Sequence, residues 1–168
     1  MRVLVLARHA KAEAHTGALT DHERTLALRG RTDAKELGAA LAAAGFEPDV
    51  AYVSDSVRTS QTWELASTAW EVPVVHLRRE LYATTVATLV GLLAGTEPGA
   101  TNVIVVGHEP TISAAALFLA GPGSSREAVD RVSGGLPTGM AVVLEFDGEW
   151  PGLAARSARL VGVVGRTE

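Results

Sequence analysis

The sequence predicts an α/β fold: one three-layer α/β/α sandwich with a mostly parallel central sheet. Short β-branched runs alternate along the chain with Ala/Leu-rich stretches of helical period, an order typical of strand–helix–strand units. At 168 residues, with 47% hydrophobic and 20% charged residues, the chain has the size and composition of one globular domain. Because neither an internal repeat nor an interdomain linker divides it, we expect a single domain over residues 1–168.

Six short apolar runs are the expected strands. The first and fourth consist almost entirely of apolar residues, which is typical of strands buried on both faces of a sheet. The last two lie close together near the end of the chain, and we expect them to form an antiparallel hairpin. The runs are Val3–Ala7, Val50–Ser54, Val72–His76, Asn102–Val106, Ala141–Phe146 and Arg159–Val164.

Helices are expected between these strands. Ala34, Leu37 and Leu41 fall on one face of a helix that ends at Gly45, a residue suited to the left-handed position after a helix, ahead of Pro48. Pro110 is suited to the first position of a helix. Further helices are expected over Val57–Ala69, Val86–Leu93 and Pro110–Leu119, with polar Gly/Pro-rich loops over Gly121–Ser125 and Ser133–Gly139.

Charge and composition exclude several classes of protein. Fifteen Lys and Arg against 19 Asp and Glu give a net charge of −4, so no overall positive field attracts nucleic acid or anionic lipid. The absence of Cys excludes disulfides, thiol nucleophiles and thiolate metal sites. Val3–Ala7 is shorter than the ~7–15 apolar residues of a secretory signal, and Ile112–Ala120 is shorter than the ~18 residues of a membrane span. We therefore expect a cytoplasmic protein.

Basic side chains follow three of the predicted strands. Arg8 and His9 come directly after the first strand, Arg58 follows the second, and His108 follows the fourth. If these strands are parallel, their carboxyl ends meet at one edge of the sheet, where α/β proteins bind ligands. Arg guanidinium groups match phosphate oxygens, and the helix that starts after Ser56 offers backbone N–H groups as well. The sequence therefore predicts a phosphate-binding site at this edge.

The residues around this edge resemble the histidine phosphatase superfamily, also called phosphoglycerate mutase-like, and specifically its small SixA-type phosphohistidine phosphatases. Arg8–Ala10 resembles the Arg-His-Gly signature of the family, and Ser54–Thr62 resembles its Ser-Pro-x-x-Arg-x-x-Gln-Thr segment. Gly107–Pro110 resembles the second histidine motif, and Arg24–Gly30 fits the SixA-type Arg-x-Leu-x-x-x-Gly stretch. Each motif alone is weak, but the ordered set is specific and covers most of the chain.

The resemblance implies a phosphoglycerate mutase-like fold and a role for each basic residue. His9 is then the nucleophile that becomes phosphorylated, while Arg8, Arg58 and His108 hold the phosphoryl oxygens. Arg24 would line the mouth of the pocket as a further substrate-binding residue. Two permanent guanidinium charges and an imidazole can stabilise a transferring phosphoryl group without a metal, so we expect no cofactor.

The sequence departs from the family pattern at two positions and leaves the general acid open. Ala10 stands where the family has glycine, and Asp55 where it has proline. Larger branches carry a catalytic carboxylate after the third strand, and Glu80 occupies a comparable stretch here, so Glu80 is our first candidate for the general acid. Asp21 and Glu109 are rivals, and a strong acid is unnecessary if the leaving group is itself an imidazole.

Other chemistry-bearing residues have simpler interpretations. Trp63 and Trp70 lie seven residues apart on one helical face, which favours packing over a substrate platform. His76 is interpreted as a solvated or half-buried polar residue. The nearest approach to a metal cluster has a spacing that fits no helical ligand pair, so we expect no metal site. That set comprises Glu13, His15, Asp21 and His22.

Together these features predict a metal-independent phosphatase that works through a phosphohistidine intermediate. Only about 25 residues separate His76 from Asn102, which leaves little room for the lid insertion of larger branches. An open pocket suits phosphohistidine on a partner protein. The alternatives are a small phosphomonoester, such as a sugar or nucleotide phosphate, and a non-catalytic phosphate-binding module. A binding module has no need of a nucleophile, so His9 argues against it.

Overall fold

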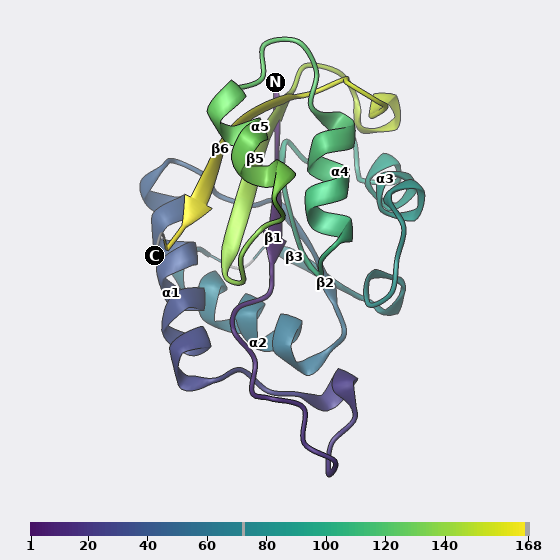
Figure 1. Ribbon diagram of the computed structural model, residues 1–168. Coiled ribbons are helices and arrows are strands. Elements are labelled where there is room, and N and C mark those ends of the chain that lie inside the picture. Colours follow the sequence, from purple (N-terminus) through teal and green to yellow (C-terminus); the bar gives the residue numbers. More distant parts are fainter. Residues whose placement is uncertain (72, 167–168) are drawn as a thin grey trace.

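The computed structural model describes residues 1–71 and 73–166, and within them six strands form one mixed sheet (Figure 1). The order across the sheet is β3-β2-β4-β1-β5-β6. The four strands from β3 to β1 are parallel, β5 is antiparallel to β1, and β6 is antiparallel to β5, which confirms the predicted hairpin. The strands are β1 (Arg2–Arg8), β2 (Val50–Ser54), β3 (Val74–Arg78), β4 (Asn102–Gly107), β5 (Met140–Phe146) and β6 (Arg159–Gly165).

Helices cover both faces of this sheet, which confirms the three-layer α/β/α sandwich. Alternate residues of β1 point to opposite faces: Leu4 and Leu6 pack with α3, α4 and α5, whereas Val5 and Ala7 pack with α1 and α2. The helices are α1 (Leu28–Ala43), α2 (Val57–Ala66), α3 (Val86–Ala94), α4 (Thr111–Leu119) and α5 (Arg126–Ser133). Short 3₁₀ turns are η1 (Asp21–Glu23), η2 (Ser67–Ala69), η3 (Arg79–Leu81) and η4 (Trp150–Gly152).

Two elements differ from the sequence-based expectation. The third strand begins at Val74 and continues to Arg78, because its register is set by pairing with β2; Val72, part of the predicted strand, lies outside the described residues. Helix α5 was not expected between the two Gly-rich loops. Only Ala128 and Val132 are buried in its eight residues, so the helix carries few apolar residues by which to predict it, and packing on α4 and β6 stabilises it.

The parallel core of the sheet brings the predicted site residues to one edge. Arg8 at the end of β1 lies opposite Gly107 at the end of β4, and the backbone N–H of His9 donates to Gly107 O at 3.0 Å. On the other side, Gly139 N donates to His9 O at 2.9 Å. Gly139 has φ +72°, and a Cβ there would lie 3.3 Å from Cβ of Asp33, so this position favours glycine. The backbone of His9 is therefore held from both sides.

The length and apolarity of the helices bear on whether the chain spans a membrane. Of the helices in the described ranges, none is both long enough and apolar enough to cross a bilayer.

Candidate active site

His9 presents a free ring nitrogen to the site. Its Nδ1 lies 2.7 Å from the carbonyl oxygen of Ala10. Because a carbonyl oxygen only accepts hydrogen bonds, this contact assigns the ring proton to Nδ1 and leaves the lone pair on Nε2. Nε of Arg58 donates to that Nε2 at 3.4 Å. His9 is 8% exposed, so its unprotonated nitrogen faces the arginine in a buried setting.

The surroundings of His9 keep its imidazole neutral. Burial lowers the pKa of His9 to about 4, and the positive charges of Arg58, Arg8 and Arg24 act in the same direction. The hydrogen bond to Ala10 opposes these effects but does not outweigh them. At neutral pH the imidazole is therefore unprotonated at Nε2 and able to attack phosphorus.

Arg58 is held in place from both ends of its side chain. It lies in the first turn of α2, where the hydroxyl of Ser56 caps the helix by accepting from Thr59 N at 3.3 Å. Its Nη1 donates to Asp21 O at 2.7 Å and its Nη2 to Asp21 Oδ2 at 3.0 Å. The side chain is thereby aimed with Nε toward His9.

Asp21 is a counter-ion in this arrangement. Hydrogen bonds from Tyr82 and Arg24, together with that from Arg58, hold the pKa of Asp21 well below its ordinary value. It is therefore ionised at neutral pH and has no proton to give. One of the three carboxylates that sequence reasoning put forward as a general acid serves instead to position Arg58.

Arg8 and His108 complete the basic cluster. Nη1 of Arg8 donates to Leu136 O at 2.9 Å, while its Nε is buried with no hydrogen-bond partner among the described residues. Nε2 of His108 lies 2.8 Å from Oγ of Ser54, and the rings of His9 and His108 are 5.3 Å apart between centroids. Burial, followed by the effects of His9 and Arg58, lowers the pKa of His108 to about 3. Both histidines are thus neutral.

These side chains line one cavity of about 320 Å³ at the carboxyl ends of the parallel strands. It brings together all five of the predicted basic residues, and sequence reasoning missed two polar residues of its wall. Lys11 could have been found from its position two residues after His9, whereas Thr138 reaches the site only through the tertiary fold. The lining residues are Arg8, His9, Lys11, Ala12, Arg24, Arg58, His108, Glu109 and Thr138.

The other two candidate acids are either outside this cavity or already engaged. The structure does not bring Glu80 to the cavity: η3 turns Leu81 into the core and Glu80 outward, 4.0 Å from Arg78. Glu109 does line the cavity, but its carboxylate accepts from Ser113 N, from Ser113 Oγ and from Leu136 N at 2.8, 2.6 and 3.1 Å. These bonds occupy both of its oxygens.

Two of the four residues considered as a metal cluster have other partners. His22 Nε2 lies 2.8 Å from Asp55 Oδ1, and Asp21 pairs with Arg58. Across residues 1–71 and 73–166, no group of three or more His, Asp or Glu side chains is arranged to hold a metal ion. His76 lies apart from the site and stacks on Tyr52, with ring centroids 5.4 Å apart.

The chain is similar to several known proteins. Residues 4–82 match the model of the histidine phosphatase superfamily (branch 1). An uncharacterized protein of Mycobacterium leprae is 34% identical over 92% of this chain and 96% of its own length. A solved structure of a candidate phosphohistidine phosphatase SixA from Nakamurella multipartitia is 32% identical, covers 97% of this chain and 95% of its own, and superimposes with a TM-score of 0.86.

A further solved structure shares the fold alone. The protein histidine phosphatase SixA complexed with tungstate is 19% identical, covers 97% of this chain and 96% of its own, and has a TM-score of 0.78. The chain therefore belongs to the histidine phosphatase superfamily, as a phosphatase of the SixA type.

Proposed function

We propose that the protein hydrolyses phosphohistidine on a partner protein through a phosphorylated His9. The observation that carries this proposal is the unprotonated Nε2 of His9, 3.4 Å from Arg58 in the cavity that also holds Arg8 and His108. A nucleophile beside two permanent positive charges is the arrangement that phosphoryl transfer requires, and no step of the proposal calls for a metal ion.

The reaction has two steps that balance without an external acid. In the first, the lone pair on His9 Nε2 attacks phosphorus while the phosphorus–nitrogen bond of the substrate breaks. The substrate ring carries a proton on its other nitrogen, so it leaves as neutral imidazole. In the second step, water attacks phosphorus while the bond to His9 Nε2 breaks; phosphate leaves with both protons of the water, and Nε2 regains its lone pair. Arg8, Arg58 and His108 face the phosphoryl oxygens in both steps.

The state of the carboxylates favours phosphohistidine over a phosphomonoester. An alkoxide leaving group is strongly basic, and a positioned acid contributes roughly 10²–10⁴-fold to its departure. Here Asp21 is ionised by its partners, and Glu109 is occupied by Ser113 and Leu136. An imidazole leaving group matches the basicity of the attacking His9 and needs no such acid. The site therefore suits a substrate with a phosphorus–nitrogen bond.

A substrate panel tests this choice. We expect kcat/KM for a phosphohistidine peptide to exceed that for sugar and nucleotide phosphates by at least about 100-fold, the contribution of the missing acid. Activity should persist in EDTA, and tungstate, the ligand in the SixA complex of the same fold, should compete with the peptide. Equal or higher activity on a phosphomonoester would reassign the protein to the small-molecule phosphatases. Binding of the peptide without turnover would make it a phosphate-binding module.

A trapping experiment tests the nucleophile. Rapid quenching at neutral or alkaline pH followed by mass spectrometry should find the phosphoryl group on His9. The His9→Gln variant should lose about 10⁴-fold in kcat, because the covalent route is gone. The matched control is His76→Gln, which removes a histidine outside the cavity and should turn over normally. A phosphoryl group on His108, or normal turnover by His9→Gln, would contradict the assignment.

A further inference from the structure

Ser54 carries a buried hydroxyl that lies against His108. It is the last residue of β2, and it is 0% exposed. Its Oγ lies 2.8 Å from Nε2 of His108. The proposed function gives His108 the task of facing a phosphoryl oxygen but gives Ser54 none. Because water does not reach this hydroxyl, its hydrogen-bond partners come from the protein, and they decide what His108 can do.

Neighbouring elements hold the two side chains together. Val53 of β2 and Val106 of β4 are register partners in the parallel part of the sheet. Ser54 and His108 therefore lie at the same edge of the sheet. The ring of Tyr82 packs edge-on against the ring of His108, with centroids 5.4 Å apart. The contact between Ser54 and His108 is thus fixed by packed strands and by a neighbouring ring.

The direction of this hydrogen bond follows from the other contact of Ser54 Oγ. The backbone N–H of Ser56 donates to this oxygen at 3.4 Å. Among residues 1–71 and 73–166, Nε2 of His108 is the one hydrogen-bond acceptor in contact with the hydroxyl. If Nε2 carried a proton instead, the hydrogen of the hydroxyl would be buried without an acceptor, which is unfavourable. The hydroxyl of Ser54 therefore donates to Nε2, and the proton of the neutral ring lies on Nδ1.

Nδ1 of His108 is the ring nitrogen left for a ligand. It forms no hydrogen bond with any residue in the described part of the chain, and His108 lines the cavity around His9. Burial lowers the pKa of His108 to about 3, so at pH 7 the ring is neutral and carries a single N–H. A neutral imidazole attracts a phosphoryl oxygen only through that N–H, because the lone pair of the other nitrogen repels it. Which nitrogen holds the proton therefore decides whether His108 supports the reaction.

On the basis of the proposed function, we propose that Ser54 is a positioning residue: it fixes the tautomer of His108, so that Nδ1–H of the neutral ring donates to a phosphoryl oxygen. Arg8 and Arg58 are permanent donors. His108 is a donor toward the phosphoryl group in only one of its two neutral tautomers. Without the hydroxyl of Ser54, Nε2 can take the proton, and His108 then turns a lone pair toward the negatively charged oxygens.

Nitrogen-15 NMR of the ligand-free enzyme at pH 7 tests the tautomer directly. The two ring nitrogens of His108, assigned by the loss of their signals in His108→Gln, should show a protonated Nδ1 and an unprotonated Nε2. In Ser54→Ala the signals should shift toward a protonated Nε2. A proton on Nε2 in the wild-type enzyme, or an unchanged tautomer in Ser54→Ala, would overturn the proposal.

A double-variant cycle tests whether Ser54 acts through His108. On a phosphohistidine peptide, Ser54→Ala should lower kcat about 10- to 100-fold, up to the loss that removal of one active-site donor causes. In the His108→Gln background the same change should lower kcat less than about twofold, because the group that Ser54 positions is gone. Equal losses in both backgrounds would show that Ser54 acts on the fold or on another group, contrary to the proposal.

The matched control is Thr96→Val, which also removes one buried hydroxyl but lies outside the cavity, where Thr96 contacts Tyr52. It should leave kcat and the His108 signals unchanged. If the wild-type enzyme does not hydrolyse the peptide, the proposed function fails, and binding of inorganic phosphate still tests Ser54. The Kd of phosphate should rise about 3- to 10-fold in Ser54→Ala and stay unchanged in Thr96→Val. Equal phosphate affinity in all three proteins would overturn the role of Ser54 even where the peptide is hydrolysed.

Discussion

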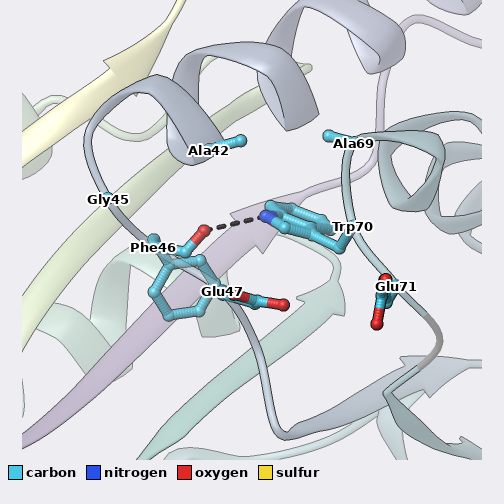
Figure 2. A pocket seen from close by; sticks show the side chains of 7 residues that line it. All are labelled: Ala42, Gly45, Phe46, Glu47, Ala69, Trp70 and Glu71. Carbon is cyan, nitrogen blue, oxygen red and sulfur yellow. Dashed lines mark hydrogen bonds between the residues drawn. The ribbon is translucent and has the colours of Figure 1, made fainter.

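Two pockets at opposite ends of the sheet differ in chemistry far more than in size. The cavity around His9, which we propose to be catalytic and call the catalytic cavity, measures about 320 Å³. A pocket near the amino end of β2 measures about 370 Å³. Figure 2 shows this second one, which we call the tryptophan pocket: Phe46, Trp70, Glu47 and Glu71 line it together with Ala42, Gly45 and Ala69. The larger of the two is thus the one without the histidines.

The aromatic side chains of the tryptophan pocket serve packing. Trp70 Nε1 donates to Phe46 O at 2.8 Å, the contact drawn in Figure 2. The rings of Trp63 and Trp70 stack with centroids 6.1 Å apart, and Phe46 meets Trp70 edge-on, which confirms the prediction that these tryptophans serve packing. The catalytic cavity instead gathers two histidines with lowered pKa and several positive charges. A group of titratable side chains with shifted pKa values, and not a large volume, therefore distinguishes the candidate active site from other pockets.

Among substitutions in the two pockets, we expect the largest effect on kcat from a change of Arg58. The Arg58→Ala variant should lose about 10²–10³-fold in kcat on a phosphohistidine peptide, because it removes a preorganised charge at the phosphoryl group. The matched control in the tryptophan pocket is Glu47→Gln, which should keep wild-type kcat. Removal of a single active-site donor usually lowers kcat far more than about threefold. A decrease in kcat below about threefold for Arg58→Ala would therefore show that Arg58 does not act in the chemical step.

The second expected effect is a pH dependence of kcat/KM that arises from His9 in the catalytic cavity. The folded pKa of His9, about 4, lies below the ordinary value of 6.5, so lowering the pH protonates the nucleophile only near pH 4. Below that, kcat/KM should fall about tenfold per pH unit. Because the pKa of His9 is lower in the folded state, the unfolded state takes up a proton on His9 at a higher pH than the folded state does. His9 therefore contributes to the free energy of unfolding above pH 6.5, and this contribution is lost as the pH falls from about 6.5 to about 4.

Nuclear magnetic resonance of the imidazole protons measures these values directly. The His9 resonance, assigned by its disappearance in His9→Gln, should titrate with a midpoint near 4, and that of His108 near 3. A midpoint for His9 near 6.5 would contradict both its burial and the influence of Arg58 on its ring.

A third prediction concerns the stability of the tryptophan pocket. Trp70→Ala removes a half-buried ring stacked on Trp63 and the hydrogen bond to Phe46, and it should lower the free energy of unfolding by about 2 kcal/mol. Urea denaturation measures this change. Because Trp70 lies far from the strand ends that hold His9, kcat of the folded variant should match the wild type. A loss of kcat with full stability would show that the two ends of the sheet are coupled.

The smallest effect is expected from Glu80. Since its side chain points outward toward Arg78, Glu80→Gln should change kcat by less than about twofold on both a phosphohistidine peptide and a phosphomonoester, as for an exposed ion pair. Parallel assays on the two substrates check this. A much larger loss on the phosphomonoester than on the peptide would identify Glu80 as the general acid and require η3 to move during catalysis.

The sequence by itself determined the architecture and the basic core of the site. Strand and helix periods are local properties of the chain, so the six strands and four of the five helices could be located from them. Arg8, His9, Arg58 and His108 could be predicted together because each follows a strand, and the carboxyl ends of parallel strands share one edge. No knowledge of side-chain packing was needed for either step.

The tertiary structure alone decided how these groups are partnered. Asp21 meets Arg58 across 37 residues, and Arg8 meets Leu136 across 128, distances over which the sequence carries no local signal. Glu80 points outward because its neighbour Leu81 enters the core, and Arg166, directly after β6, reaches Asp33 of α1 across 133 residues. The identity of a chemical group is encoded locally, but its protonation, orientation and partners are set by contacts between distant segments.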